Sequence, residues 1–133
     1  MGNIEVRASI NYCFEEDDVD HGWCELHGTV VNGSSKKIVV DEWRLKCEDA
    51  ENEWSILSLD QDSTIVLNAR EAVTRKIDMR ESLYNAIKGI EGTARLVVID
   101  KNEKEYCSEK ISLEGIRQGS LISIKNLEDK YNG

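Results

Sequence analysis

The sequence predicts an all-β protein, an antiparallel β-sandwich of seven or eight strands with one short helix near residues 79–88. Three observations lead to this prediction. Apolar and polar residues alternate along most of the chain, turn-forming stretches recur about every eight to twelve residues, and helices do not separate the strands. A parallel α/β sheet is thereby excluded, and strands with this spacing pack as two facing antiparallel sheets.

The first half of the chain contains the clearest strands. From Ile4 to Phe14 every even position is apolar and most odd positions are polar, which predicts a long half-buried strand. The same alternation follows in Trp23–Val31 and Ile38–Cys47. Between these two segments lies the turn "NGSSKK", whose Asn-Gly pair suits positive φ.

Shorter strands are predicted in the second half of the chain: Trp54–Leu59, Thr64–Leu67, Val73–Met79, Thr93–Asp100 and Tyr106–Leu113. One segment, "DMRESLYNAIKGI", breaks this period. Its Asp78 can cap a helix, and Gly89 lies where a helix C-terminus needs positive φ. A short helix is therefore predicted to cross between two strands, and a loop of similar sequence is the alternative.

We expect one β-sandwich domain over residues 1–113 and a C-terminal extension over 114–133, made of an added edge strand and a polar tail. The extension contains Leu121, Ile122 and Ile124, and apolar side chains left in water are unfavourable. These three residues are therefore predicted to make an interaction. The segment either adds a strand to its own sheet or docks on a second copy, and a disordered tail is the third alternative.

The net charge of −9 makes nucleic acid and anionic membrane surfaces unfavourable partners, because both would repel the chain. A protein partner is expected instead, either a basic one or a second copy of the chain. No apolar run approaches the roughly twenty residues that a membrane span needs. The first residues lack the features of a signal peptide, which predicts a cytoplasmic protein with free thiols, and an exported fragment is the alternative.

Two acidic loops, Glu15–Asp20 and Glu48–Glu53, are predicted to lie at the same end of the sandwich. The repulsion between their like charges has three alternative remedies: screening by water and salt, a basic partner, or a bound divalent cation. The sequence leaves these three interpretations open. The carboxylates available to calcium are Glu15, Asp17, Asp18, Asp20, Asp49 and Glu51. No EF-hand pattern is present, and no other cofactor is expected.

Zinc-type ligands occur in the same region, at Cys13, His21, Cys24 and His27. Side chains of paired strands alternate between two faces, which places Cys24 on the core side and Cys13 and His27 on the outer side. The four residues therefore do not converge. We expect neither a zinc site nor a disulfide between Cys13 and Cys24.

Two stretches, "HGTVVNGSSKKIVVDEWRLKC" and "TARLVVIDKNEKEYCSEKISL", resemble bacterial immunoglobulin-like β-sandwich modules. In those modules a strand ending in Val-x-Asn-x-Ser leads into a strand that carries the core aromatic residue, and a final hairpin turns at a polar tip. The resemblance covers roughly residues 4–113. It implies an immunoglobulin-like sandwich with a role in binding, adhesion or scaffolding, and it carries no catalytic residue.

The sequence contains no nucleophile elbow, phosphate-binding loop, dinucleotide fingerprint or zinc-protease motif, so no catalytic residue is assigned. We expect a non-enzymatic protein-interaction or structural module that acts through its loops or a sheet edge. The alternative is a cation- or small-ligand-binding module that uses the acidic loops.

Overall fold

The structure, a computed structural model, describes residues 3–56, 64–79 and 81–132. Within these residues the chain forms nine strands and two helices. In chain order they are β1 (Ile4–Glu15), β2 (Asp18–Asn32), β3 (Ile38–Glu48), β4 (Glu53–Ile56), β5 (Ile65–Leu67), β6 (Ala72–Asp78), α1 (Glu81–Ile87), β7 (Thr93–Asp100), β8 (Glu105–Cys107), β9 (Ile111–Ser112) and α2 (Leu113–Asn132). The prediction of a fold made mostly of antiparallel strands is confirmed. The last residues of the strand predicted over Trp54–Leu59 lie outside the described residues.

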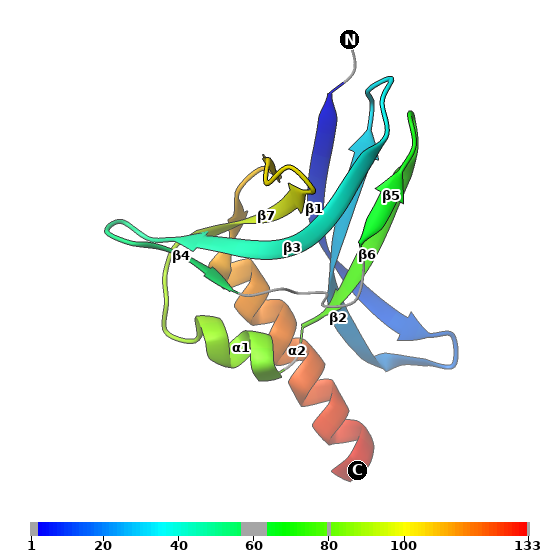
Figure 1. The fold of residues 1–133 in the computed structure, drawn as a ribbon. Coiled ribbons are helices and arrows are strands. Elements are labelled where there is room, and N and C mark those ends of the chain that lie inside the picture. The colour runs from blue at the N-terminus through cyan, green and yellow to red at the C-terminus, as the bar shows by residue number, and fades with distance from the viewer. Residues whose placement is uncertain (1–2, 57–63, 80, 133) are drawn as a thin grey trace.

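Two antiparallel sheets make up the fold (Figure 1). One has the order β1-β2-β6, and the other has the order β4-β3-β7-β8, with β5 also paired to β3 and β9 to β7. In Figure 1 β3 and β7 run across the view, β1, β2 and β6 run steeply, and α2 extends below them to the C-terminus. No described strand of one sheet pairs with the other sheet, so the two layers are not closed.

The core lies where side chains of the two sheets meet. Leu26 on β2, Trp43 on β3 and Leu96 on β7 are among its fully buried members. The sheets approach each other closely at Gly28, because a Cβ added there would lie 2.3 Å from Leu96 Cδ2 and 3.1 Å from Trp43 Cζ3. Close packing at this point of β2 therefore requires a glycine.

The even-numbered side chains of β1 share one face, as predicted, but only the first of them are well covered. Val6 is 6% exposed, whereas Ile10, Tyr12 and Phe14 are 36%, 42% and 50% exposed. The β1–β2 hairpin extends beyond the second sheet in Figure 1. Its distal half therefore carries apolar side chains that no other layer covers fully.

The C-terminal segment is a helix, so the prediction of an added edge strand is wrong. α2 meets Cys24 of β2 through two small buried residues, Gly119 and Ser123. Ser123 Oγ accepts a 2.7 Å hydrogen bond from the backbone N–H of Cys24. Small residues contribute little hydropathy, and the pattern of large apolar residues therefore did not reveal this buried face.

The predicted short helix is confirmed as α1. It is followed by Gly89 at φ +76°, the left-handed conformation that a helix C-terminus commonly uses. Arg117 of α2 donates hydrogen bonds to the carbonyl oxygens of Ile87 and Ile90. A cation at this end of α1 also interacts favourably with the helix dipole, so α2 stabilises the end of α1.

Candidate functional site

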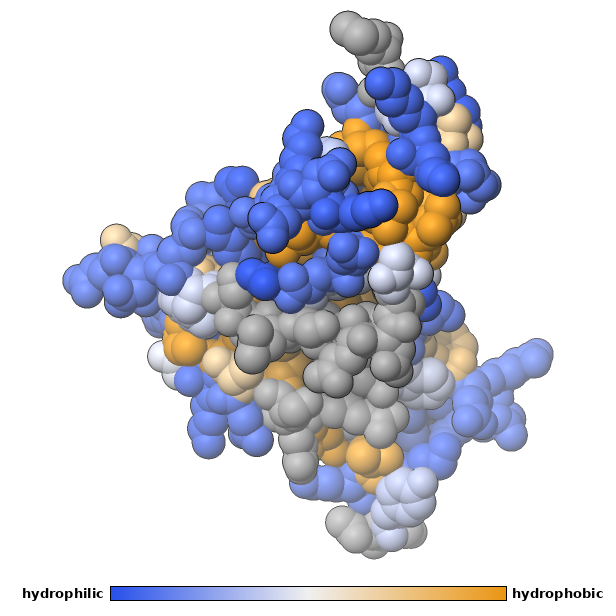
Figure 2. Space-filling view, in the orientation of Figure 1, coloured by the Kyte–Doolittle hydropathy of each residue, from blue (hydrophilic) through white to orange (hydrophobic). Residues whose placement is uncertain are grey.

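The two acidic loops do not meet, and the prediction that they share one end of the sandwich is wrong. In Figure 1 the tip of the β1–β2 hairpin and the tip of the β3–β4 hairpin point to opposite sides. Both tips form hydrophilic arms in Figure 2. The loops diverge because each hairpin follows the direction of its own sheet.

Two carboxylates of these loops have local partners. Asp18 pairs with His21 at 2.6 Å and with Lys130 at 3.2 Å, and the hydrogen bond from His21 lowers the pKa of Asp18, with help from Lys130. Asp49 Oδ1 accepts two backbone N–H groups of its own turn, which lower its pKa. The remaining carboxylates predicted to bind calcium are exposed: Glu15, Asp17, Asp20 and Glu51. Among described residues, none of the six belongs to a group of three or more ligand atoms within 4.8 Å.

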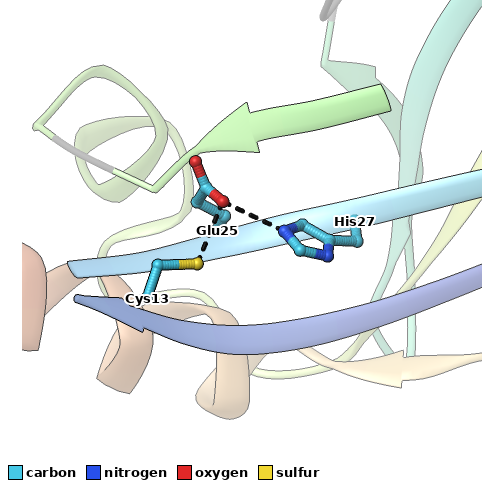
Figure 3. Close-up of side chains that lie close together, drawn as sticks. All are labelled: Cys13, Glu25 and His27. Carbon is cyan, nitrogen blue, oxygen red and sulfur yellow. Dashed lines mark hydrogen bonds and ion pairs between the residues drawn. The ribbon is translucent and has the colours of Figure 1, made fainter. Parts of the chain in front are cut away.

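The predicted zinc-type residues divide between the two faces of the β1–β2 hairpin, as expected. Cys24 is buried under α2, and His21 pairs with Asp18. Cys13 and His27 lie on the outer face, where the structure brings both of them to Glu25 (Figure 3). Glu25 was not predicted as a site residue.

The hairpin register brings the three side chains together. Cys13 lies opposite Trp23, so Glu25 is its diagonal neighbour, and His27 follows Glu25 on the same face of β2. Cys13 Sγ donates a hydrogen bond to Glu25 Oε1 at 3.0 Å, and His27 Nε2 lies 3.0 Å from the same oxygen. The side chains of Glu25 and His27 are 15% and 23% exposed, so solvent reaches the cluster from one side.

The electrostatics of the cluster follow from these contacts. The hydrogen bond to the Glu25 carboxylate, together with burial, raises the pKa of the Cys13 thiol to about 11. Burial alone would raise the pKa of Glu25, but hydrogen bonds from Cys13, His27 and Trp23 together lower it. The carboxylate is therefore ionised and the thiol keeps its proton near neutral pH.

Thiol labelling of the native chain should distinguish Cys13 from the exposed Cys107. A pKa of about 11 instead of 9.0 lowers the thiolate fraction of Cys13 by about a hundredfold near neutral pH. We expect iodoacetamide to modify Cys107 first and Cys13 much later, and the buried Cys24 and Cys47 only after unfolding. Peptide mass spectrometry measures the order. Equal initial rates at Cys13 and Cys107 would contradict the thiol–carboxylate contact.

The three residues predicted to make an interaction near the C-terminus lie on α2. Leu121 and Ile122 are 41% and 42% exposed, and Ile124 is half-buried. Ile122 lies on the same side of the helix as Asn126, which donates a hydrogen bond to Tyr12 of β1 at 3.4 Å. Since α2 docks on β2 through its small residues, Leu121 and Ile122 stay on the surface.

β1 has a neighbouring strand on one side only. It is 12 residues long, and among the described strands it pairs only with β2. The hydrogen bond from the Gly33 N–H to the Asn3 carbonyl shows that odd-numbered residues form the hydrogen-bonded pairs with β2. The N–H and C=O groups of even-numbered residues, such as Ala8 and Ile10, therefore point to the free edge, where no hydrogen bond joins them to a described residue.

A groove follows the first half of this edge. It has a volume of about 1140 Å³ and lies between residues 3–8, which include the start of β1, and residues 107–111, which run from the end of β8 to the start of β9. Its charged lining consists of four basic residues and two acidic residues: Arg7, Arg70, Arg95, Lys110, Glu5 and Glu109. The groove is therefore locally basic, although the whole chain carries a net charge of −9.

Figure 2 shows that the surface in this view is mostly hydrophilic, with hydrophobic atoms exposed over the region where β3 and β5 lie in Figure 1. Val66 of β5 is 50% exposed. Among the described residues, no helix has the length and apolar character needed to cross a membrane.

Comparison with known proteins adds little information about these surfaces. No protein family model matches the sequence, and no curated protein matches it. A solved structure described as "X-ray structure of Northeast Structural Genomics Consortium target SoR45" is similar with a TM-score of 0.46 and 10% identity, over 83% of this chain and 84% of that chain. A similarity at this level supports no conclusion about function.

Proposed function

We propose that this protein is a non-enzymatic interaction module that binds an extended segment of a partner protein in the groove between β1 and residues 107–111. The main support for this proposal is the free edge of β1, whose outward N–H and C=O groups have no hydrogen-bond partner among the described residues. A strand added there would satisfy these groups and fill the opening between the sheets. Such binding takes affinity from main-chain hydrogen bonds and specificity from side-chain contacts.

The regularity of β1 supports this use. Soluble proteins usually protect a long free edge with bulges, inward charges or short strands. The pairing of β1 with β2 is regular from Ile4 to Cys13, and the irregularity comes only after Cys13. An edge that is long, regular and apolar on one face favours aggregation unless another chain covers it, and a binding partner is the covering chain that we propose.

The lining of the groove favours an acidic segment. Arg7 is paired with Glu5 at 2.7 Å and Lys110 with Glu48 at 2.6 Å, but Arg70 and Arg95 also line the groove, with Glu109 as the other acidic residue. This choice differs from the basic partner predicted from the net charge of the whole chain. The groove lining is basic whereas the whole chain is acidic. A segment bound in the groove lies close to the lining charges, and salt screens the more distant charges of the chain.

We also propose that the sandwich is immunoglobulin-like. The strand order supports this proposal, since β1-β2-β6 corresponds to strands A-B-E and β4-β3-β7-β8 to strands C′-C-F-G of that fold. The groove then lies between the first and the last strand of the sandwich. The alternative function, a cation-binding module built on the acidic loops, has no comparable support, because those loops lie apart.

A pair of proline variants tests the free edge. Ala8→Pro removes an outward N–H and should change the free energy of unfolding by less than about 1 kcal/mol, because edge positions tolerate proline. Ser9→Pro removes an N–H that bonds to β2 and should destabilise the protein clearly more. Chemical denaturation measures both. In the wild type, hydrogen exchange should be faster at Ala8 and Ile10 than at Arg7 and Ser9, and equal protection at all four would overturn the proposal.

Binding is tested with peptides selected from a random display library on the immobilised wild-type chain. We expect acidic peptides that bind Ala8→Pro about tenfold or more weakly, because one main-chain hydrogen bond is lost and the proline ring blocks close approach. Ala8→Ser keeps the N–H and should bind like the wild type. Fluorescence polarisation gives the affinities, and equal affinity for the wild type and Ala8→Pro would contradict binding at this edge.

A further inference from the structure

The outer face of the β1–β2 hairpin carries a second feature, independent of the groove. We propose that Cys13, Glu25 and His27 form a binding site for a divalent transition metal ion of the zinc class. Their three ligand atoms lie within 4.8 Å of one another, and among the described residues no other set of three or more Cys, His, Asp and Glu side chains does so. Figure 3 shows the thiol and the imidazole directed at the carboxylate from two sides.

The distances fit a tetrahedral metal ion after a small adjustment. Ligand atoms around zinc are about 3.3–3.8 Å apart, given metal–ligand bonds of roughly 2.0–2.3 Å. Here Sγ and Nε2 each lie 3.0 Å from Glu25 Oε1. Opening these contacts by a few tenths of an ångström needs only side-chain rotation, because the strand register already places the three residues on one face.

The hydrogens of the cluster lie where the metal would bind. The Cys13 thiol and His27 Nε2 both direct a hydrogen at Glu25 Oε1, since an ionised carboxylate can only accept. On metal binding, the Cys13 thiol would release its proton to solvent, and His27 would give up the hydrogen on Nε2 and keep one on Nδ1. The ion would then be held by the thiolate, by His27 Nε2 and by the Glu25 carboxylate. It would also remove the repulsion that otherwise arises between a thiolate and a neighbouring carboxylate.

The donor set selects the class of metal. Sulfur, nitrogen and oxygen ligands together suit zinc and similar ions, whereas calcium and magnesium take oxygen ligands only. The side chains are partly exposed, so the fourth coordination position is open to water or to a group from a partner.

A nucleophilic role for Cys13 is a weaker interpretation of the same residues. Such a role needs a thiolate beside a base or a cation. Cys13 instead donates its proton to a carboxylate, which disfavours the thiolate. Lys76 lies opposite His27 on β6 and is the nearby positive charge that acts on Cys13, but its influence is smaller than that of Glu25.

Cobalt titration of the reduced full chain tests the proposal. Co²⁺ should bind in one equivalent and give a sulfur-to-cobalt charge-transfer band, Zn²⁺ should displace it, and Ca²⁺ should not. Cys13→Ser should abolish the band, and His27→Gln should weaken binding by roughly 10–100-fold or more, since even outer-shell partners have effects of that size. Cys107→Ser and His21→Gln are matched controls that remove a thiol and an imidazole elsewhere, and both should behave like the wild type.

A second measurement does not depend on the variants folding. In the wild type, Zn²⁺ should slow the alkylation of Cys13 and leave the rate at Cys107 unchanged, as read by peptide mass spectrometry. The proposal is overturned if the charge-transfer band survives in Cys13→Ser, if it disappears in Cys107→Ser, or if Zn²⁺ leaves Cys13 as reactive as before.

Discussion

A chain that ends at Ser112 is expected to lose cooperative unfolding. The truncation removes α2, whose Leu113 and Ile116 are fully buried, and it uncovers Met79, which lies against Gly119 in the core. Each large apolar side chain returned to water costs roughly 1.5–3 kcal/mol, and the net stability of a domain is only about 5–15 kcal/mol. Circular dichroism and calorimetry should therefore show no sharp thermal transition.

A chain that ends at Glu128 is the matched control for this truncation. It removes the exposed Tyr131 and the surface ion pair between Lys130 and Asp18, and it leaves the buried face of α2 intact. The free energy of unfolding should change by less than about 1 kcal/mol. A sharp transition near the wild-type temperature in the chain ending at Ser112 would show that α2 contributes little to the fold.

Gly28→Ala is expected to be strongly destabilising although it adds a single methyl group. The new Cβ would lie 2.3 Å from Leu96 Cδ2 and 3.1 Å from Trp43, and both side chains are fully buried. Neither can move away without disturbing its own neighbours, because the core is close-packed. Overpacking of this kind lowers the free energy of unfolding by roughly 1–3 kcal/mol, which denaturant titration measures.

Gly115→Ala separates this steric effect from the general effect of replacing glycine. A Cβ at Gly115 would lie 3.6 Å from Ile10 Cδ1, an ordinary van der Waals contact, and the residue belongs to α2. Alanine in a helix is more favourable than glycine by about 0.5–1 kcal/mol, so this variant should be as stable as the wild type or slightly more stable. Equal effects of Gly28→Ala and Gly115→Ala would argue against tight packing at Gly28.

Part of the candidate metal site could be predicted from the sequence. Alternation alone placed Cys13 and His27 on the outer face and Cys24 on the inner face, and the structure confirms both placements. Glu25 was not predicted, because its carboxylate is one of 26 acidic side chains in the chain and only thiols and imidazoles are rare enough to stand out. Its position was available, since an E-x-H pair on one strand presents both side chains on the same face.

The groove along β1, in contrast, could not be predicted from the sequence. The sequence predicts that loops or a sheet edge act in binding, but it does not show which edge stays free. That depends on whether β8 approaches β1 closely enough to pair, and the two strands lie about a hundred residues apart in the chain. In the structure a groove separates residues 3–8 from residues 107–111.

The sequence by itself determined most of the strands and the direction of their side chains, because alternation is a local property of an extended backbone. The strand predicted over Tyr106–Leu113 is an exception, since it is divided into β8 and β9 and Leu113 begins α2. It also determined α1, whose end depends on the single residue Gly89. The tertiary structure alone decided that the small residues of α2 pack on β2, that the acidic hairpins diverge and that β1 keeps a free edge. Each of these depends on contacts between segments far apart in the chain, and such contacts leave no periodic pattern in either segment.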